Sequence, residues 1–265
     1  MRSVPFSTRH IRSVCLLLCL GACAGQNLPG IGRGDTTGST LQIAQATEKS
    51  GDYAGAAKLY ERVLSADPNN TAALLGAGES YAALGQTLRA ESALMRGLQL
   101  QPNNILMLNQ LGRIKFVEHD GPSAVAYFDK ALSVDQRNVS ALTGKAVALD
   151  YQSQHTAAQR VYQQALRLYP TNFILLSNYA LSLASSGQQE KGIAILQDLI
   201  RDPNAAPHVR GNLALVYGLA GRDEDARATL KTDMSAAKIE ENIGVYRALR
   251  HLMLEGKPIG ALVFG

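Results

Sequence analysis

The stretch that decides the fold is TAALLGAGESYAALGQTLRAESALMRGLQLQPNN, residues 71–104. Its first half places apolar and small residues at i, i+3, i+4 and i+7, which is one face of a helix: Leu74, Ala77, Gly78 and Tyr81. A turn at Gly85-Gln86 follows, and a second amphipathic segment ends at Pro102, which has no N–H with which to continue a helix. The stretch therefore predicts two helices joined by a tight turn.

The same pattern recurs every 34 residues along most of the chain. Positions that share this period are Leu74, Leu108, Leu142 and Leu176; Asn70, Asn104, Asn138 and Asn172; and Ala56, Ala90, Ala124 and Ala158. A fixed period in this range indicates a repeat protein in which each helix pair packs on the next. Small side chains such as Gly78 and Ala90 let the two helices of a pair approach closely.

These features resemble the tetratricopeptide repeat (TPR). In one register the copies are 37–70, 71–104, 105–138, 139–172, 173–206 and 207 onward. The resemblance implies an all-α fold, a TPR α-solenoid of about six helix-turn-helix repeats with a C-terminal capping helix. We assign the solenoid to residues 39–237, the capping helix to 238–256 and an apolar tail to 257–265.

The ends of the solenoid carry their own signals. Ser39-Thr40-Leu41-Gln42 is a capping-box pattern and predicts the start of the first helix. Asp233 stands at a usually small position and predicts an early end to the second helix of the last copy. The capping helix has an apolar stripe and ends at Gly256 and Pro258; the stripe is Ile239, Ile243, Tyr246 and Leu249. The tail after it either docks on the body or binds a partner.

Two copies depart from the repeat at the turn between their helices. His119 and Ser153 stand where the other copies have glycine, for example Gly85.

The N-terminus has the layout of a secretory signal. Residues 1–22 contain three arginines, a short apolar run and small residues before Cys23. Leu20-Gly21-Ala22-Cys23 resembles the bacterial lipobox, which implies cleavage before Cys23 and lipidation of its thiol; the alternative is a plain signal peptide. Residues 23–38 would then be the lipidated cysteine and a flexible Gly-rich tether. Ala24 after the cysteine favours the outer membrane, with the protein facing the periplasm.

Charge and composition argue against several function classes. The formal net charge is +4, but without residues 1–22 the chain has 23 basic and 22 acidic groups, so nothing favours a nucleic-acid partner. The four histidines after the signal lie on separate copies, and no catalytic or phosphate-binding motif is present; they are His119, His155, His208 and His251. We expect no enzyme activity, no cofactor, no metal and no small-molecule substrate.

The TPR resemblance places partner binding in a concave groove formed by the first helix of each repeat. The positions that line the groove in the family correspond to Leu75, Glu79, Leu106, Asn109, Arg113, Phe116, Val117, Val147, Asp150, Tyr151, Ile174, Leu181, Leu215 and Leu219. So much apolar surface predicts a docked protein segment, with Asn109 and Arg113 giving polar specificity. The alternative is that these residues pack against the next repeat.

The C-terminal third narrows the resemblance. Residues 212–222 read NLALVYGLAGR, and Asn242 precedes Tyr246-Arg247-Ala248-Leu249-Arg250. This resembles the TadD family, TPR lipoproteins of the tight-adherence (Flp) pilus assembly system. The resemblance implies a pilotin-like scaffold that binds the secretin or another pilus-assembly subunit. The alternatives are a TPR lipoprotein adaptor for peptidoglycan enzymes and a type IV pilus pilotin.

The lipobox hypothesis yields a direct prediction. Cys23→Ala removes the thiol that would carry the lipid, so we expect the protein to leave the membrane fraction while its helical content stays unchanged. Cell fractionation and circular dichroism measure the two effects. A membrane fraction as large as that of the unmodified protein would rule out lipid anchoring at Cys23.

Overall fold

The computed structural model describes residues 36–201 and 206–265. Over these residues the chain forms fourteen helices and no strand. The helices are α1 Thr36–Lys49, α2 Tyr53–Ala66, α3 Thr71–Ala83, α4 Thr87–Leu100, α5 Ile105–Val117, α6 Gly121–Val134, α7 Val139–Tyr151, α8 His155–Leu168, α9 Phe173–Ser185, α10 Gln189–Leu199, α11 Ala206–Leu219, α12 Asp223–Leu230, α13 Ala236–Leu254 and α14 Gly260–Phe264. The predicted signal peptide (1–22), Cys23 and most of the predicted tether lie outside the described residues.

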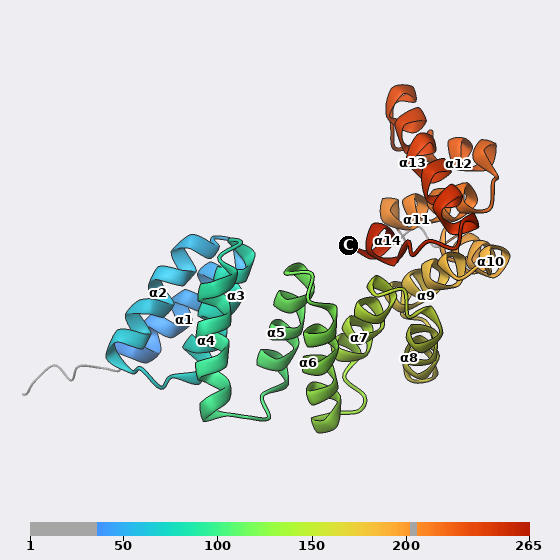
Figure 1. The fold of residues 1–265 in the computed structure, drawn as a ribbon. Helices are drawn as coiled ribbons and strands as arrows, with labels where there is room; N and C mark the ends of the chain where they lie inside the picture. The colour runs from blue at the N-terminus through green and yellow to red at the C-terminus, as the bar shows by residue number, and fades with distance from the viewer. Residues whose placement is uncertain (1–35, 202–205) are drawn as a thin grey trace, which may run out of the picture. The chain divides into compact units, whose positions relative to one another are not determined.

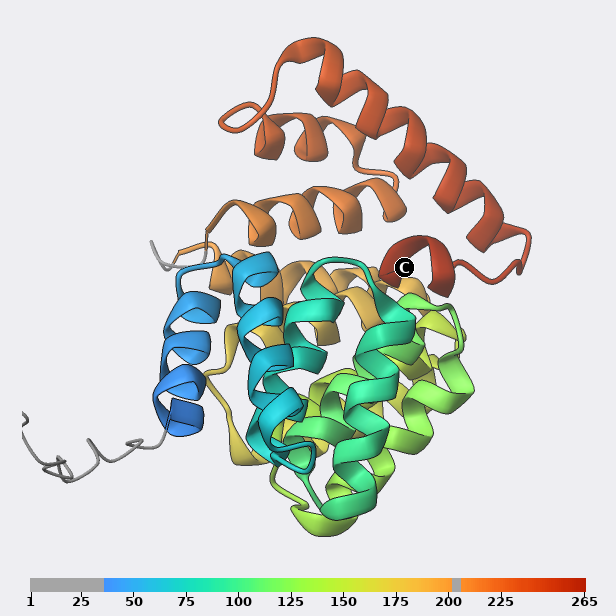
Figure 2. The ribbon, with the colours of Figure 1, turned by 90° about the vertical axis from the view of Figure 1, so that its left-hand side faces the viewer.

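Residues 37–265 form one compact unit of consecutive helix pairs, from α1–α2 to α11–α12, closed by α13 (Figures 1 and 2). The predicted TPR architecture is confirmed. Within the described ranges no helix combines the length and the hydropathy that crossing a bilayer requires.

Asparagine starts the first helix of four successive repeats. The side-chain Oδ1 atoms of Asn70, Asn104, Asn138 and Asn172 accept hydrogen bonds from the backbone N–H three residues later, at 3.0, 3.2, 2.9 and 3.1 Å. Each bond satisfies an N–H group that has no partner inside the helix. The 34-residue spacing of these asparagines therefore sets the start of each first helix.

Each turn between paired helices contains one residue in the left-handed region. Glycine supplies it in four copies: Gly51, Gly85, Gly187 and Gly221, with φ of 87°, 71°, 89° and 81°. His119 and Ser153 adopt the same conformation with φ of 62° and 58°. A side chain at such a φ is strained, so these two turns keep their residues at an energetic cost.

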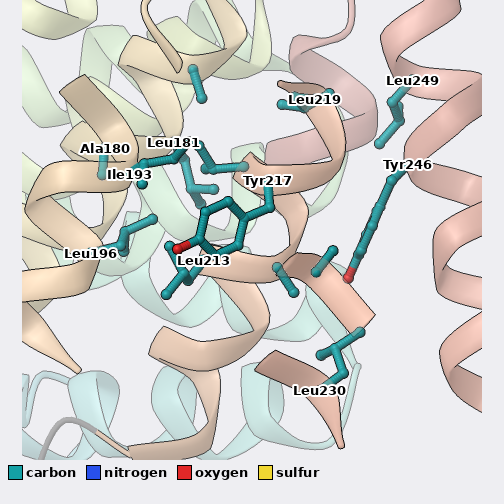
Figure 3. Close-up of a cluster of buried hydrophobic side chains, with 14 of the residues drawn as sticks. Ala180, Leu181, Ile193, Leu196, Leu213, Tyr217, Leu219, Leu230, Tyr246 and Leu249 are labelled. Carbon is teal, nitrogen blue, oxygen red and sulfur yellow. The ribbon is translucent and has the colours of Figure 1, made fainter. Parts of the chain in front are cut away.

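Small residues let the paired helices pack. A Cβ atom on Gly78 would lie 2.6 Å from Leu94 Cγ, which is closer than real contacts allow. Ala90 and Leu94 on α4 are fully buried against this face. The core continues along the stack, and Figure 3 shows its C-terminal part, in which Tyr217 lies among Leu181, Leu213 and neighbouring side chains.

The C-terminal end closes much as the sequence predicts. The early end of α12 is confirmed, since the helix ends at Leu230. Asp233 follows it and accepts hydrogen bonds from Arg210 at both carboxylate oxygens, at 2.6 and 2.7 Å. All four stripe residues of α13 are buried, which confirms the capping helix. Its bounds are Ala236–Leu254 rather than 238–256, because Ser235 caps its start.

One boundary prediction was wrong, and one open alternative is resolved. The capping box at Ser39 does not start the first helix, because α1 already begins at Thr36 and includes residues 36–38 of the expected tether. The tail of residues 257–265 docks on the body, which is one of its two predicted alternatives: it contains α14, which contacts α7 and α9.

The pair packing generates a stability prediction. Gly78→Val places a branched side chain against Leu94, and overpacking of this kind lowers the free energy of unfolding by about 1–3 kcal/mol. Urea unfolding followed by circular dichroism measures it. Gly244→Val on the exposed face of α13 is the matched control, because its new Cβ meets nothing within 4 Å. Equal loss in both variants would contradict close packing at Gly78.

Candidate partner-binding face

A hollow of about 490 Å³ opens on the face formed by α5, α7 and the start of α9. It is lined by Arg113, Phe116, Val117, Phe128, Val139, Ser140, Thr143, Gly144, Val147, Asn172 and Ile174. Val117 and Ile174 are 65% and 49% exposed, a large fraction for aliphatic side chains. The hollow is the kind of concave apolar surface on which a protein segment docks.

The floor of the hollow comes from the second helix of a pair. The ring of Phe128 on α6 reaches between α5 and α7 and is itself buried. A Cβ on Gly144 would lie 2.3 Å from this ring, so only glycine admits Phe128 at this point. The absence of a side chain at residue 144 thus gives the hollow its depth.

One positive charge stands at the rim. Arg113 is exposed, and no salt bridge joins it to any other residue that the structure describes. The neighbouring lysines are engaged: Lys115 bonds Glu91 and Glu118, and Lys145 bonds Asp129 at 2.6 Å. An apolar hollow beside a cation with no protein partner suits an apolar segment that carries a carboxylate.

The structure places part of the predicted groove at this hollow. Arg113, Phe116, Val117 and Val147 line it, together with Ile174. Leu106 is 58% exposed two helical turns before Arg113, although it is not a lining residue.

Two polar predictions were wrong because the side chains are buried. Asn109 donates from Nδ2 to Asn138 Oδ1 at 3.0 Å, so it ties α5 to the cap of α7. Asp150 is fully buried; its Oδ1 accepts from Ser182 Oγ at 2.7 Å and lies 2.7 Å from His155 Nδ1. Burial raises the pKa of the Asp150 carboxyl, and the bonds from His155 and Ser182 oppose that rise.

Two leucines were also wrongly placed in the groove. Leu181 and Leu219 are only 5% and 2% exposed and belong to the C-terminal core cluster. The same cluster includes Ile259, and Val263 and Phe264 pack against it. The tail therefore helps to cover part of the first-helix face that the repeat register predicts to be exposed.

The remaining predicted residues have local roles. Leu75 and Leu215 are half-buried against core clusters. Glu79 accepts a hydrogen bond from Gln110 Nε2 at 2.9 Å. Tyr151 stacks on His119, with its hydroxyl 2.9 Å from His119 Nδ1, and packs edge-on against Phe116 with ring centroids 5.4 Å apart.

Sequence reasoning missed several lining residues, namely Phe128, Val139, Ser140, Thr143, Gly144 and Asn172. Ser140 and Thr143 follow Leu106 and Asn109 by one period of 34, so the same register contained the signal. Phe128 gave no such signal, because it belongs to a second helix. Where the chain is described, no three His, Cys, Asp or Glu side chains gather as a metal site would require.

Comparison with known proteins agrees with this fold. Two tetratricopeptide-repeat family models match residues 49–113 and 143–207. The uncharacterised protein y4yS of Sinorhizobium fredii is 37% identical over 144 residues, which cover 52% of this chain and 79% of that protein.

Solved structures share the fold at low sequence identity. PilW, described as a widely conserved type IV pilus biogenesis factor, has a TM-score of 0.70 and 18% identity over 79% of this chain and 98% of that one. YrrB, described as a TPR protein with an unusual peptide-binding site, has a TM-score of 0.52 and 18% identity over 65% of this chain and 90% of that one. With the repeat geometry above, the two family-model matches establish that the chain belongs to the tetratricopeptide-repeat family.

Proposed function

We propose that this protein is an outer-membrane, periplasm-facing scaffold of the TadD kind, anchored through a lipid on Cys23, that binds a component of the Tad/Flp pilus machine. The secretin is the partner that the family resemblance favours. The observation that carries the binding role is the open apolar hollow with the exposed Arg113 at its rim.

Two likenesses support a role in binding. YrrB shares this fold and is described as having a peptide-binding site. PilW shares it over nearly its whole length and is described as a pilus biogenesis factor. The lipobox at residues 20–23 supports anchoring, and the balanced charge of residues 23–265 supports a protein partner over a nucleic acid.

The hollow also indicates the chemistry of the bound segment. Val117, Val147 and Ile174 present aliphatic surface, and Phe128 presents an aromatic floor. A bulky apolar residue of the partner would be desolvated there, while an acidic residue a few positions away would meet Arg113. An apolar segment that carries an acidic residue is therefore the ligand that this face fits best.

A type IV pilus pilotin is the second candidate, favoured by the likeness to PilW. The two candidates share the binding face and differ in which secretion machine supplies the partner.

Charge reversal tests the hollow. Arg113→Glu places a carboxylate beside the acidic residue of the partner, and we expect at least about tenfold less partner to be recovered, since losing a partly desolvated charge pair costs more than about 1.4 kcal/mol. Detergent pull-down of the tagged full chain, with mass spectrometry of the bound proteins, measures the recovery. Phe116→Ala is expected to act in the same direction.

Arg160→Glu is the matched control, because Arg160 is exposed on the second helix α8, away from the hollow. The proposal is supported if a secretin or another Tad component is recovered with Arg160→Glu but not with Arg113→Glu. Type IV pilus components in its place would favour the second candidate. Recovery of peptidoglycan enzymes, or equal recovery with both variants, would contradict the proposal.

A further inference from the structure

A second part of the first-helix face is already covered, and the chain covers it with its own tail. Gly256 turns the chain after α13 with φ of 69°, and Ile259 and Gly260 are then buried. α14 contacts α7 and α9. Figures 1 and 2 show that the segment after α13 leads away from that helix and places α14 beside the earlier repeats.

The fit between α14 and the surface beneath it is close. The backbone N–H of Gly260 donates to Ser153 Oγ at 3.1 Å. A Cβ on Gly260 would lie 2.0 Å from the backbone oxygen of Asp150, so no other residue fits there without displacement. Val263 and Phe264, three and four positions later on the same helical face, pack against the core cluster.

The two strained turns support a specific role for this surface. Ser153 accepts the bond from Gly260, and His119 positions Tyr151. A Cβ on Gly265 would lie 3.2 Å from Tyr151 Cε2, so Tyr151 lies between His119 and the end of α14. Non-glycine residues persist at positive φ where the side chain contributes something that glycine cannot, and such sites concentrate at ligand clamps.

α14 has little intrinsic helical stability, so its helical structure depends on its contacts with the rest of the chain. It has five residues, far fewer than an isolated helix needs in water. Its Leu262 is 61% exposed, so only one face of the helix is held. A short element with few buried contacts opens at a low free-energy cost.

We propose that the surface formed by α7, α9 and Ser153 is a second partner-binding site that α14 occupies in the free protein. The partner segment that takes its place is a short helix with glycine at the point of closest approach and bulky apolar residues three and four positions later. Phe116 lines the hollow and contacts Tyr151, so the covered site continues the open one. This inference rests on the proposed scaffold role and adds its regulation.

The experiment uses the full chain in detergent and a fluorescent, C-terminally amidated peptide of residues 257–265 as the probe. Gly260→Val expels α14 without altering the surface beneath it, so fluorescence anisotropy should show the variant binding the probe at least tenfold more tightly than the unmodified protein. Gly244→Val on the exposed face of α13 is the matched control and should bind like the unmodified protein. Circular dichroism reports whether each variant is folded.

Phe264→Ser is the second variant, because it removes an apolar anchor of α14 without adding bulk, and it should also bind the probe more tightly. Equal binding by all four proteins, or no binding by either tail variant while folded, would overturn the proposal. The probe contains no pilus component, so its result is independent of the pull-down. If the pull-down recovers no pilus component but the tail variants still bind the probe more tightly, the pilus partner is rejected and the site under α14 is retained.

Discussion

The structure depends on the close approach of two helices within each repeat. Gly78 leaves no space for a side chain beside Leu94, and the fully buried Ala90 keeps the opposing helix equally near. The asparagine caps then fix where each first helix starts, and hence which of its residues face the neighbouring repeat. The hollow follows from the same constraint, since Gly144 lets Phe128 pass under α7 and form its floor.

The fold was predictable because its determinants are local and repeated. Helix starts, turn glycines and small interface residues each recur at 34-residue spacing, so each repeat supports the assignment of the next. The boundaries of α1 and α13 were less accurate, because several polar residues near each end are suitable caps and only packing selects one.

The site was predictable only in part, because exposure on a repeat face depends on what covers it. The register brought Arg113, Phe116, Val117 and Val147 to the hollow. It misplaced Leu181 and Leu219, which lie in a core cluster that includes part of the tail. Nor could the period show that the Asn109 side chain turns toward the cap of α7, because that hydrogen bond joins two residues 29 positions apart in the sequence.

Departures from the repeat were more informative about function than the repeat itself. The turn position with positive φ is glycine in four copies, but it is His119 and Ser153 in two adjacent copies. Both side chains then serve contacts around Tyr151 and α14. Breaking a local rule in favour of such contacts is typical of functional surfaces, where other interactions offset the cost of the strained backbone.

The tail also sets a condition on any partner that uses the covered surface. A tethered segment competes at an effective concentration of roughly millimolar, so a free helix of the same chemistry would lose to α14 on affinity alone. A partner that also fills the hollow avoids this disadvantage, because the contacts at Arg113 and Val147 add to those it gains from replacing α14. Since Phe116 and Tyr151 connect the two surfaces, one continuous segment can engage both. The arrangement would therefore favour partners that match both adjoining surfaces over those that match only the surface under α14, which is a physical basis for selectivity in a face composed mostly of apolar side chains.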